Sequence, residues 1–463
     1  MEPAILGAGL AAGKLRISAD EMRRAWGHLR PRGLATKSAC AWDEDAATLA
    51  VEASARALEA SGADPEEIGL VAVATSGHEA ASAVVAEALG LRYARLLDVG
   101  GRRTAGLAAL VAAFDSARAV ERPMLAVAVD VPRAAPGDPA EQAEGAGAAA
   151  FVVGPGAGAR LAAAGSAARE VLGGRILDAA GVARSPDLDD VPHGLFEDAL
   201  AVLGPLPPID ALVASPVGTT LPGPGGKPLA ARHTLESAER RLGDLGAAQA
   251  PFDLALALAD AEPGHRLVAA ARDAGAVTIV HLEAVTRAAV AGVKAVADGG
   301  RPASVHQALM ERGAFAAGAA IPEEPLGAYI PPATYTRDLP ARYRLEASRC
   351  GACGRLAYPP PAACPACGGR AFARERLAGR AVVETFTVIG RGGSPGEFAP
   401  EQAFAGEYPV AVVRFEEGPR VTARLADVET GRIAIGLEVE PALRRLYRQQ
   451  GAWRYGLKFV PTS

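Results

Sequence analysis

Long hydrophobic runs are missing from this 463-residue sequence. No stretch of about eighteen apolar residues occurs, which is the length that a helix needs to cross a membrane. A basic surplus is missing too, because 48 lysines and arginines stand against 53 acidic residues and leave a net charge of −5. Nucleic-acid-binding proteins generally carry the opposite balance. No export signal is visible, so we expect a cytoplasmic protein that binds neither a membrane nor nucleic acid.

Aromatic residues are also few. They make up 5% of the chain, whereas 50% of it is hydrophobic and 53 residues are glycine. At this length the chain exceeds one ordinary domain, so we expect two or three globular domains.

Cysteine is scarce, with five in the chain, and four of them fall in one short stretch. They form two C-x-x-C pairs separated by ten residues, Cys350 and Cys353 followed by Cys364 and Cys367. Two such turns place four thiolates in the tetrahedral arrangement that Zn²⁺ prefers, and a closed four-sulfur site leaves no position for a reacting water. Disulfides are disfavoured in a cytosolic chain, and a redox pair would not need a second copy. We therefore predict a structural zinc site and interpret Cys40 as a small apolar filler in a loop.

Strands alternate with helices over the first 320 residues. Short apolar runs bounded by turn residues predict buried strands, and longer runs with an apolar stripe predict helices. We expect strands at 68–75, 95–99, 124–131, 146–153, 209–214 and 277–282, and helices at 43–61, 81–89, 104–120, 233–242, 253–261 and, for the most part, 284–297. The alternation predicts an α/β fold with a parallel sheet covered on both faces, in two halves, 1–160 and 161–320.

The end of the chain has a different pattern. Five prolines between 321 and 340 indicate a linker over 321–345, and the cysteine motifs follow within 346–373. Period-2 runs after them predict short strands at 381–388, 408–415, 420–425 and 437–439. Several short strands behind a zinc site favour a small all-β barrel over 374–463, and the five-stranded OB type fits the length.

Residues from 346 onward resemble the DUF35 family. The likeness is carried by the two cysteine motifs, Pro359-Pro360, the run YPVAVV at 408–413 and Ile435-Gly436-Leu437. Members of this family pair a rubredoxin-like zinc ribbon with an OB-fold, accompany thiolase-type enzymes, and contact acyl-CoA and the partner subunit. The resemblance therefore implies a thiolase-like partner and a coenzyme A ester as a ligand.

The first 320 residues resemble the thiolase superfamily, and within it the hydroxymethylglutaryl-CoA (HMG-CoA) synthases and the initiating ketoacyl synthases. The segments that carry this likeness include DEDAATLAVEA at 43–53, TAGLAAL at 104–110 and EGAGAAA at 144–150. The resemblance implies a duplicated, thiolase-like αβαβα fold. It also implies a homodimer or a hetero-oligomer, because members of the superfamily dimerise.

The sequence departs from this superfamily at three catalytic positions. The resemblance places a nucleophilic cysteine at the start of a buried helix, where this chain has Arg103. It places a histidine at the end of an apolar strand, where Ala214 stands beside Ser215, and an asparagine where Asp244 stands. A guanidinium cannot form a thioester, so the acyl-transfer apparatus of these enzymes has been lost or rebuilt.

Candidate catalytic residues are therefore few. His78 and Glu79 follow a buried strand, where α/β proteins place functional side chains, and the resemblance implies a general base from this region. The alternative for this pair is a solvated loop. Ser215 is a third candidate, beside the position of the missing histidine.

Two functions remain open. The missing cysteine and histidine favour a thiolase-fold scaffold or pseudoenzyme subunit that supports a catalytic thiolase-like partner and binds coenzyme A esters. The alternative is an HMG-CoA synthase-like condensing acyltransferase or retro-aldolase that works through acid/base groups. Arg102 and Arg103 could bind a phosphate or carboxylate at the start of their helix, but we favour an ion pair with Asp244 or Asp98.

Overall fold

In a computed structural model of the chain, the described residues are 2–77, 80–169, 176–177, 183–184, 194–222, 227–233, 235–273, 275–314, 331–390, 402, 406–449 and 452–462. The chain divides into two compact units, 1–314 and 315–463. Within the described ranges, no helix combines the length and the apolar character that a membrane crossing requires.

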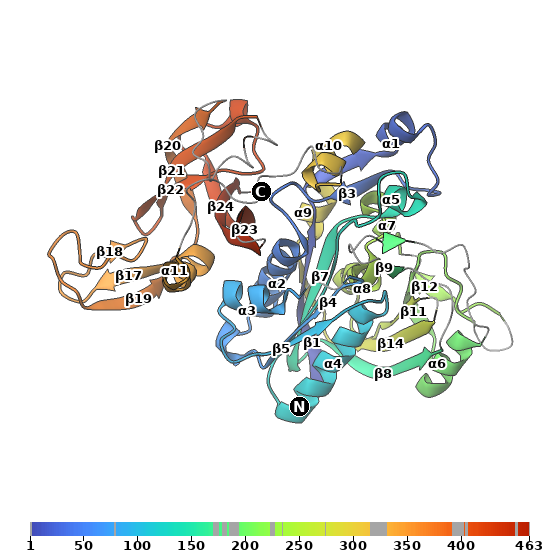
Figure 1. Ribbon diagram of the computed structural model, residues 1–463. Helices are drawn as coiled ribbons and strands as arrows, with labels where there is room; N and C mark the ends of the chain where they lie inside the picture. Colours follow the sequence, from blue (N-terminus) through green and yellow to red (C-terminus); the bar gives the residue numbers. More distant parts are fainter. Residues whose placement is uncertain are drawn as a thin grey trace. The chain divides into compact units, whose positions relative to one another are not determined.

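Five strands of the first half lie side by side in one large sheet (Figure 1). Their order in the sheet is β1-β7-β6-β4-β5. β4 runs parallel to β5 and β6, whereas β7 runs antiparallel to both of its neighbours, β6 and β1. Their bounds are Pro3–Ala12 for β1, Leu70–Ala74 for β4, Arg95–Val99 for β5, Met124–Asp130 for β6 and Gly147–Pro155 for β7.

The second half repeats this arrangement. Its strands are β8 (Ala159–Ala168), β11 (Ile209–Ser215), β12 (Ala231–His233), β13 (Arg266–Arg272) and β14 (Ala276–Ala284), and they stand in the order β8-β14-β13-β11-β12. β11 runs parallel to β12 and β13, and β14 runs antiparallel to both neighbours. Numbered along its own half, each set of five strands follows the order 1-5-4-2-3. The duplication that the sequence resemblance implies is therefore present.

The sheet is mixed, so the prediction of a parallel sheet was wrong for part of it. β7 and β14 are antiparallel to their neighbours, and β1 pairs antiparallel with β8 where the two halves meet. Only three residues separate β13 from β14. Such a short connection cannot hold the crossover helix that a parallel pair needs.

Helices lie between the two halves and on their outer faces (Figure 1). α4 (Ala105–Val120) and α8 (Gln249–Ala259) occupy equivalent places in the two halves and contact each other. α4 also contacts β6 and β14, and α8 contacts β13 and β7, so both helices touch strands of both halves. α2 (Ala46–Ser61) packs on β1 and β7 and against α3 (Ser82–Leu89), whereas α6 (Leu195–Leu203) packs on β8 and β14.

Local sequence explains how these helices begin. The Asp45 carboxylate accepts the N–H of Thr48 at 3.0 Å, and the Thr48 hydroxyl accepts the N–H of Asp45 at 2.9 Å, which closes a capping box on α2. α4 starts with small residues instead. A Cβ on Gly106 would lie 2.0 Å from the carbonyl oxygen of Ala247, so glycine is required for this close approach of α4 to the loop before α8.

Two predicted helices differ from the structure. The helix expected over 233–242 is confined to α7 (Glu239–Leu242), because Ser237 Oγ and the Ala238 N–H both donate to the Asp253 carboxylate and hold the preceding segment out of the helix. The segment 284–297 contains β15 (Ala289–Ala291), which pairs parallel with β1, before α9 (Val293–Asp298) begins. Strand pairing here overrides the helix propensity of alanine.

Smaller elements complete the first unit. β2, β3 and β16 form a three-stranded sheet, and β9 and β10 pair with each other. Their bounds, with those of the remaining helices, are Leu15–Ser18 for β2, Thr36–Ala39 for β3, Arg301–Pro302 for β16, Ile176–Leu177 for β9, Ala183–Arg184 for β10, Ala19–Trp26 for α1, Pro139–Ala143 for α5 and Val305–Glu311 for α10.

The described residues of the second unit include the helix α11 and two small sheets. α11 (Pro332–Arg344) lies in the segment predicted as a linker, and the domain limits drawn from the sequence stay predictions. A three-stranded antiparallel sheet follows, with β17 (Glu346–Cys350) between β18 (Leu356–Ala357) and β19 (Phe372–Arg376).

The last sheet of the chain has five strands in the order β22-β21-β20-β23-β24, all antiparallel. Their bounds are Ala381–Ile389 for β20, Tyr408–Phe415 for β21, Arg420–Arg424 for β22, Glu438–Gln449 for β23 and Ala452–Pro461 for β24. β24 was not expected from the sequence, although the five-stranded OB type was. Phe415 and Phe459, from β21 and β24, pack edge to face in its core.

Candidate functional site

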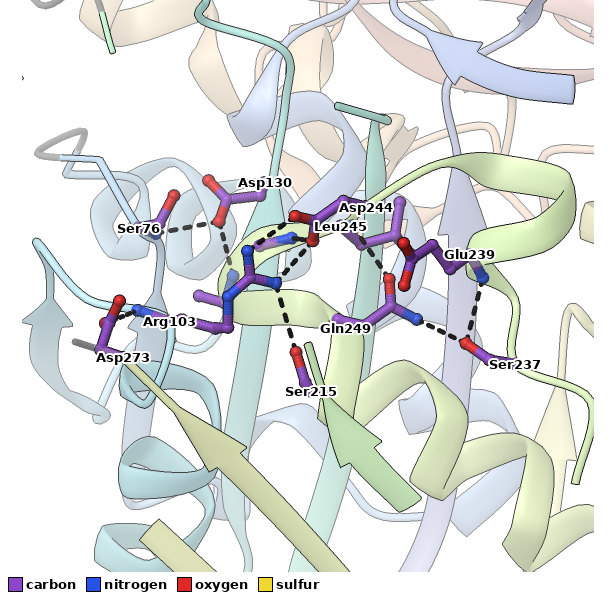
Figure 2. Close-up of polar contacts among 12 residues, drawn as sticks. Ser76, Arg103, Asp130, Ser215, Ser237, Glu239, Asp244, Leu245, Gln249 and Asp273 are labelled. Carbon is purple, nitrogen blue, oxygen red and sulfur yellow. Dashed lines mark hydrogen bonds and ion pairs between the residues drawn. The ribbon is translucent and has the colours of Figure 1, made fainter. Parts of the chain in front are cut away.

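Several strand ends and loops of the first unit meet at one place. β6 and β11 end at Asp130 and Ser215, and Asp273 follows the end of β13. The turn before α4 brings Arg103 to the same place, and the loop before α8 brings Asp244 (Figure 2). The carboxyl ends of strands are where α/β proteins usually bind ligands.

Arg103 is the central residue of this candidate site (Figure 2). Its terminal nitrogens donate to the two carboxylate oxygens of Asp244, both at 2.6 Å, and one of them also donates to Ser215 Oγ at 3.3 Å. The backbone N–H of Arg103 donates to the Asp273 carboxylate at 2.6 Å. Burial opposes the charge, but the carboxylates of Asp244, Asp273 and Asp130 together outweigh burial, so the pKa of Arg103 is raised. Arg103 is therefore a permanent cation.

The ion pair expected from the sequence is present, and its partner is Asp244. Asp98, the other partner considered, instead accepts hydrogen bonds at the start of α3, from the backbone N–H groups of Ala81 and Ser82 and from the Ser82 hydroxyl at 2.6 Å. Asp98 therefore caps a helix, and Asp244 balances Arg103.

Asp130 adds a further negative charge near Arg103. It is 3% exposed. Its carboxylate accepts hydrogen bonds from Thr75 Oγ1 at 3.0 Å, from the backbone N–H groups of Ser76 and Ala247 at 3.1 and 2.7 Å, and from the Arg133 guanidinium at 2.6 Å. Asp130 thereby joins β4, β6 and the loop before α8, and its charge favours the cationic form of Arg103.

Glu239, on α7, is a functional candidate that the sequence analysis missed. Burial and the neighbouring Asp244 carboxylate raise the pKa of Glu239 to about 7, although Arg103 acts in the opposite direction. A carboxyl group with this pKa can take up or release a proton near neutral pH. Glu239 stands in the charged run ESAERR at 236–241, which reads as a solvated helix face and gave no functional signal.

The loop that carries Asp244 is held in place by the segment before β7. The Asp244 N–H donates to the carbonyl of Ala143 at 2.7 Å, and the Gly145 N–H donates to the carbonyl of Asp244 at 2.9 Å. A Cβ on Gly145 would lie 1.8 Å from the carbonyl oxygen of Leu242. The glycine-rich segment 144–150 is thus explained by a close backbone approach that fixes the position of Asp244.

Of the three candidate catalytic residues, Ser215 alone lies within the described residues. Ser215 is 1% exposed at the end of β11 and accepts a hydrogen bond from Arg103. His78 and Glu79 lie outside the described residues. Cys40 lies half-buried in the loop between β3 and α2, where it neighbours Arg312.

The four cysteines of the second unit form a candidate metal site. Their ligand atoms all lie within 4.8 Å of one another, and the Cys350–Cys367 and Cys353–Cys364 sulfur pairs are 3.6 and 3.7 Å apart. Four sulfurs at about 2.3 Å from a tetrahedral zinc would be about 3.8 Å apart. The residues therefore fit a Zn²⁺ ion.

Known proteins resemble both units of the chain. The family description "ChsH2, rubredoxin-like zinc ribbon domain" matches residues 337–373, and "ChsH2, C-terminal OB-fold domain" matches residues 374–444. A DUF35 domain-containing scaffold protein of Pyrococcus furiosus is 36% identical over 129 residues, which is 27% of this chain and 90% of that protein.

The chain is also similar to an HMG-CoA synthase in sequence, and to a solved structure in fold. The hydroxymethylglutaryl-CoA synthase of Archaeoglobus fulgidus is 37% identical over 154 residues, 30% of this chain and 44% of that one, so the chain spans less than half of this relative. A structure described as MvaS in complex with 3-hydroxy-3-methylglutaryl coenzyme A superposes with a TM-score of 0.56 at 19% identity, over 71% of this chain and 94% of the other.

A thiolase-like α/β unit followed by a zinc ribbon and an OB-fold defines the class of this protein. The chain belongs to the DUF35 family, and it carries the DUF35 zinc ribbon and OB-fold behind an HMG-CoA synthase-like unit.

Proposed function

We propose that this chain is a scaffold or pseudoenzyme subunit that supports a catalytic thiolase-like partner and binds coenzyme A esters. The observation that carries the proposal is the two-point ion pair of Arg103 with Asp244, at 2.6 Å, where the resemblance places the nucleophilic cysteine. A guanidinium held cationic by a carboxylate cannot lose a proton or form a thioester. The covalent route of the related synthases is closed at this residue.

Similarity supports the choice of ligand and the scaffold role. The structure that shares the fold of the first unit is a complex with 3-hydroxy-3-methylglutaryl coenzyme A. The relative of the second unit is named a scaffold protein. A structural zinc in the ribbon would fix the turns of the second unit without taking part in chemistry.

The edge strand β5 supports assembly with a thiolase-like partner, either a second copy or a different chain. Among the described strands, β5 pairs with β4 alone and ends its side of the sheet. Leu96 and Leu97 on this strand are 49% and 38% exposed, and the neighbouring Tyr93 is 67% exposed. An exposed apolar edge strand is a template for pairing with another strand.

Purification of the tagged full chain from its native cells tests this proposal. The preparation is compared with the chain purified alone, using acetoacetyl-CoA turnover and mass spectrometry of any acyl-enzyme. We expect the isolated chain to be inactive and to carry no acyl group, and we expect a co-purified thiolase-like protein to supply both activities. Turnover by the isolated chain would contradict the scaffold role.

Glu239 favours a second candidate function, a condensing acyltransferase or retro-aldolase without a covalent thioester. Its pKa of about 7 suits proton transfer, and the neighbouring Arg103 could stabilise a developing oxygen anion. In a retro-aldol step the base removes the hydroxyl proton, the carbon–carbon bond breaks, and its electron pair moves onto the enolate oxygen. If this function holds, the isolated chain cleaves a β-hydroxyacyl-CoA and Glu239→Gln lowers kcat about 100-fold, whereas the exposed Glu236→Gln does not.

A further inference from the structure

Three polar side chains meet at the start of α8, next to the candidate site of the first unit. Gln249 is 0% exposed, and Asp253, one turn further along α8, is 2% exposed. The Gln249 amide nitrogen donates to the Asp253 carboxylate at 2.9 Å and to Ser237 Oγ at 3.2 Å. Ser237 Oγ in turn donates to the Asp253 carboxylate at 2.6 Å. Ser237, Gln249 and Asp253 are called the polar triad below.

The polar triad holds the two segments that carry Glu239 and Asp244. Ser237 Oγ accepts the backbone N–H of Glu239 at 3.2 Å (Figure 2). The Gln249 side-chain oxygen accepts the backbone N–H of Leu245, the residue after Asp244, at 3.0 Å (Figure 2). One amide group therefore joins both segments, because its nitrogen reaches α7 through the serine and its oxygen reaches the loop before α8.

The hydrogen bonds of the polar triad are complete. Gln249 uses its oxygen and both of its amide hydrogens, and the Asp253 carboxylate also accepts the N–H of Ala238 at 2.8 Å. The neighbouring Phe252 and Leu254 on α8 are 0% exposed, so apolar side chains fill the surrounding core. Burying polar groups among them costs free energy that hydrogen bonds must offset, and a fully paired network fixes the orientation of what it binds. The triad is therefore suited to orienting the attached segments.

The position of Glu239 decides which charges act on its carboxyl group. The charged side chains that act on it are those of Asp244, Arg103 and Asp253. Lys37 lies on β3, which packs against α7, but its ammonium group is bound to a carboxylate of α5 at 2.7 Å. Electrostatic interactions weaken with distance and with exposure to water. A shift of α7 relative to the loop before α8 would therefore change the proton affinity of Glu239.

We propose that the polar triad positions the Glu239 carboxyl group beside the Arg103–Asp244 ion pair. Its members are positioning residues, because they act on the carboxyl group through the backbone of α7 and through the loop before α8. The use of this position for proton transfer rests on the second candidate function. The positioning itself does not depend on any reaction.

Urea unfolding of the full chain between about pH 4 and about pH 9 tests the inference. Each variant is compared with the same variant carrying Glu239→Gln, and the pH at which their stability difference levels off reports the pKa of Glu239 in the folded chain. It should be about 7 in the unmodified chain. We expect Gln249→Leu and Ser237→Ala each to lower it by about one pH unit or more, because the released carboxyl group gains water and moves from Asp244. Ser237→Thr keeps the hydroxyl group and should keep the value of about 7.

Gln307→Leu is the matched control. Gln307 on α10 also donates to a carboxylate four residues further along its helix, that of Glu311, at 2.7 Å. Its loss should lower stability at every pH and leave the pKa of Glu239 unchanged, as any purely structural loss would.

Three results would overturn the inference. They are an unchanged pKa of Glu239 in both Gln249→Leu and Ser237→Ala, an equal decrease in the control variant, and an ordinary pKa of Glu239 in the unmodified chain. If Gln249→Leu does not fold, Ser237→Ala decides alone, because Ser237 is only half-buried. The measurement uses no substrate, so its failure leaves the proposed function standing, whereas a chain without retro-aldol activity refutes the second candidate function alone.

Discussion

Arg103 and Asp244 come from opposite halves of a duplicated fold and meet in a two-point ion pair, with both nitrogen–oxygen distances at 2.6 Å. The exposed fraction of the side chain is 14% for Arg103 and 20% for Asp244. The pair thus fills the space at the start of α4 with two opposite charges that satisfy each other.

Removing one member of this pair should destabilise the first unit. Arg103→Ala leaves the Asp244 carboxylate partly buried without its cation, and we expect a loss of about 2–3 kcal/mol in the free energy of unfolding. Asp244→Ala should act similarly, and the double variant should lose less than the two single losses combined. Urea unfolding measures all three, with Arg23→Ala as the control, because Arg23 pairs with Asp20 on the surface. Strictly additive losses would show that the pair is not coupled.

The stability of the first unit should depend on the ionisation of Glu239. The pKa of Glu239 is about 7 in the folded chain, above the ordinary 4.5, so the folded state binds this proton more tightly than the unfolded state. The stabilising contribution is complete below about pH 4.5 and is lost as the pH rises through 7. Between pH 5 and pH 8 the unmodified chain should therefore lose about 1–2 kcal/mol relative to Glu239→Gln, after allowance for partial exposure.

Unfolding at several pH values measures this difference. Glu236→Gln is the control, because Glu236 lies exposed and pairs with Arg240. It should follow the pH profile of the unmodified chain. A Glu239→Gln variant with that same profile would show that Glu239 titrates normally.

Metal removal should destabilise the second unit. The four sulfurs lie where one ion can bind all of them, so the free energy of metal binding stabilises the folded unit and is lost when the ion is removed. A strong chelator or Cys364→Ser should lower the thermal midpoint of this unit by at least about 10 °C and abolish the zinc signal in elemental analysis. Cys40→Ser, outside the four, should leave one zinc per chain. Full zinc content in Cys364→Ser would contradict the assignment.

The exposed edge of strand β5 should determine whether the chain associates with a second protein chain. Leu97→Lys places a charge on the exposed apolar edge and should shift the chain towards the monomer in analytical ultracentrifugation. Val202→Lys is the matched control, because Val202 is 65% exposed on α6, away from β5 in the sheet order. An unchanged association state in Leu97→Lys would place the interface elsewhere.

The sequence predicts much of this fold because its strongest signals are local. The spacing of the cysteines is set by two tight turns, and α2 is marked at both ends by Asp45 and Gly62. Strand directions were partly missed, because an apolar run reads the same whether its neighbours run parallel or antiparallel. β15 was hidden in an alanine-rich segment that becomes a strand only by pairing with β1.

The candidate site was predicted less completely. The ion pair of Arg103 was expected, because a cation at the start of a buried helix needs a nearby carboxylate. Glu239 was missed because its pKa depends on burial and on Asp244, neither of which a charged run in the sequence reveals. Asp130 was missed for a related reason, since its hydrogen-bond partners come from three distant segments.

The repeated strand order divides the ion pair between two copies of one unit. Arg103 belongs to the first copy of the repeat, and Ser215 and Asp244 belong to the second. Because the cation and its two-point counter-charge lie in different copies, this ion pair exists only when both copies have folded and met. Neither copy folded alone would hold Arg103 in this environment.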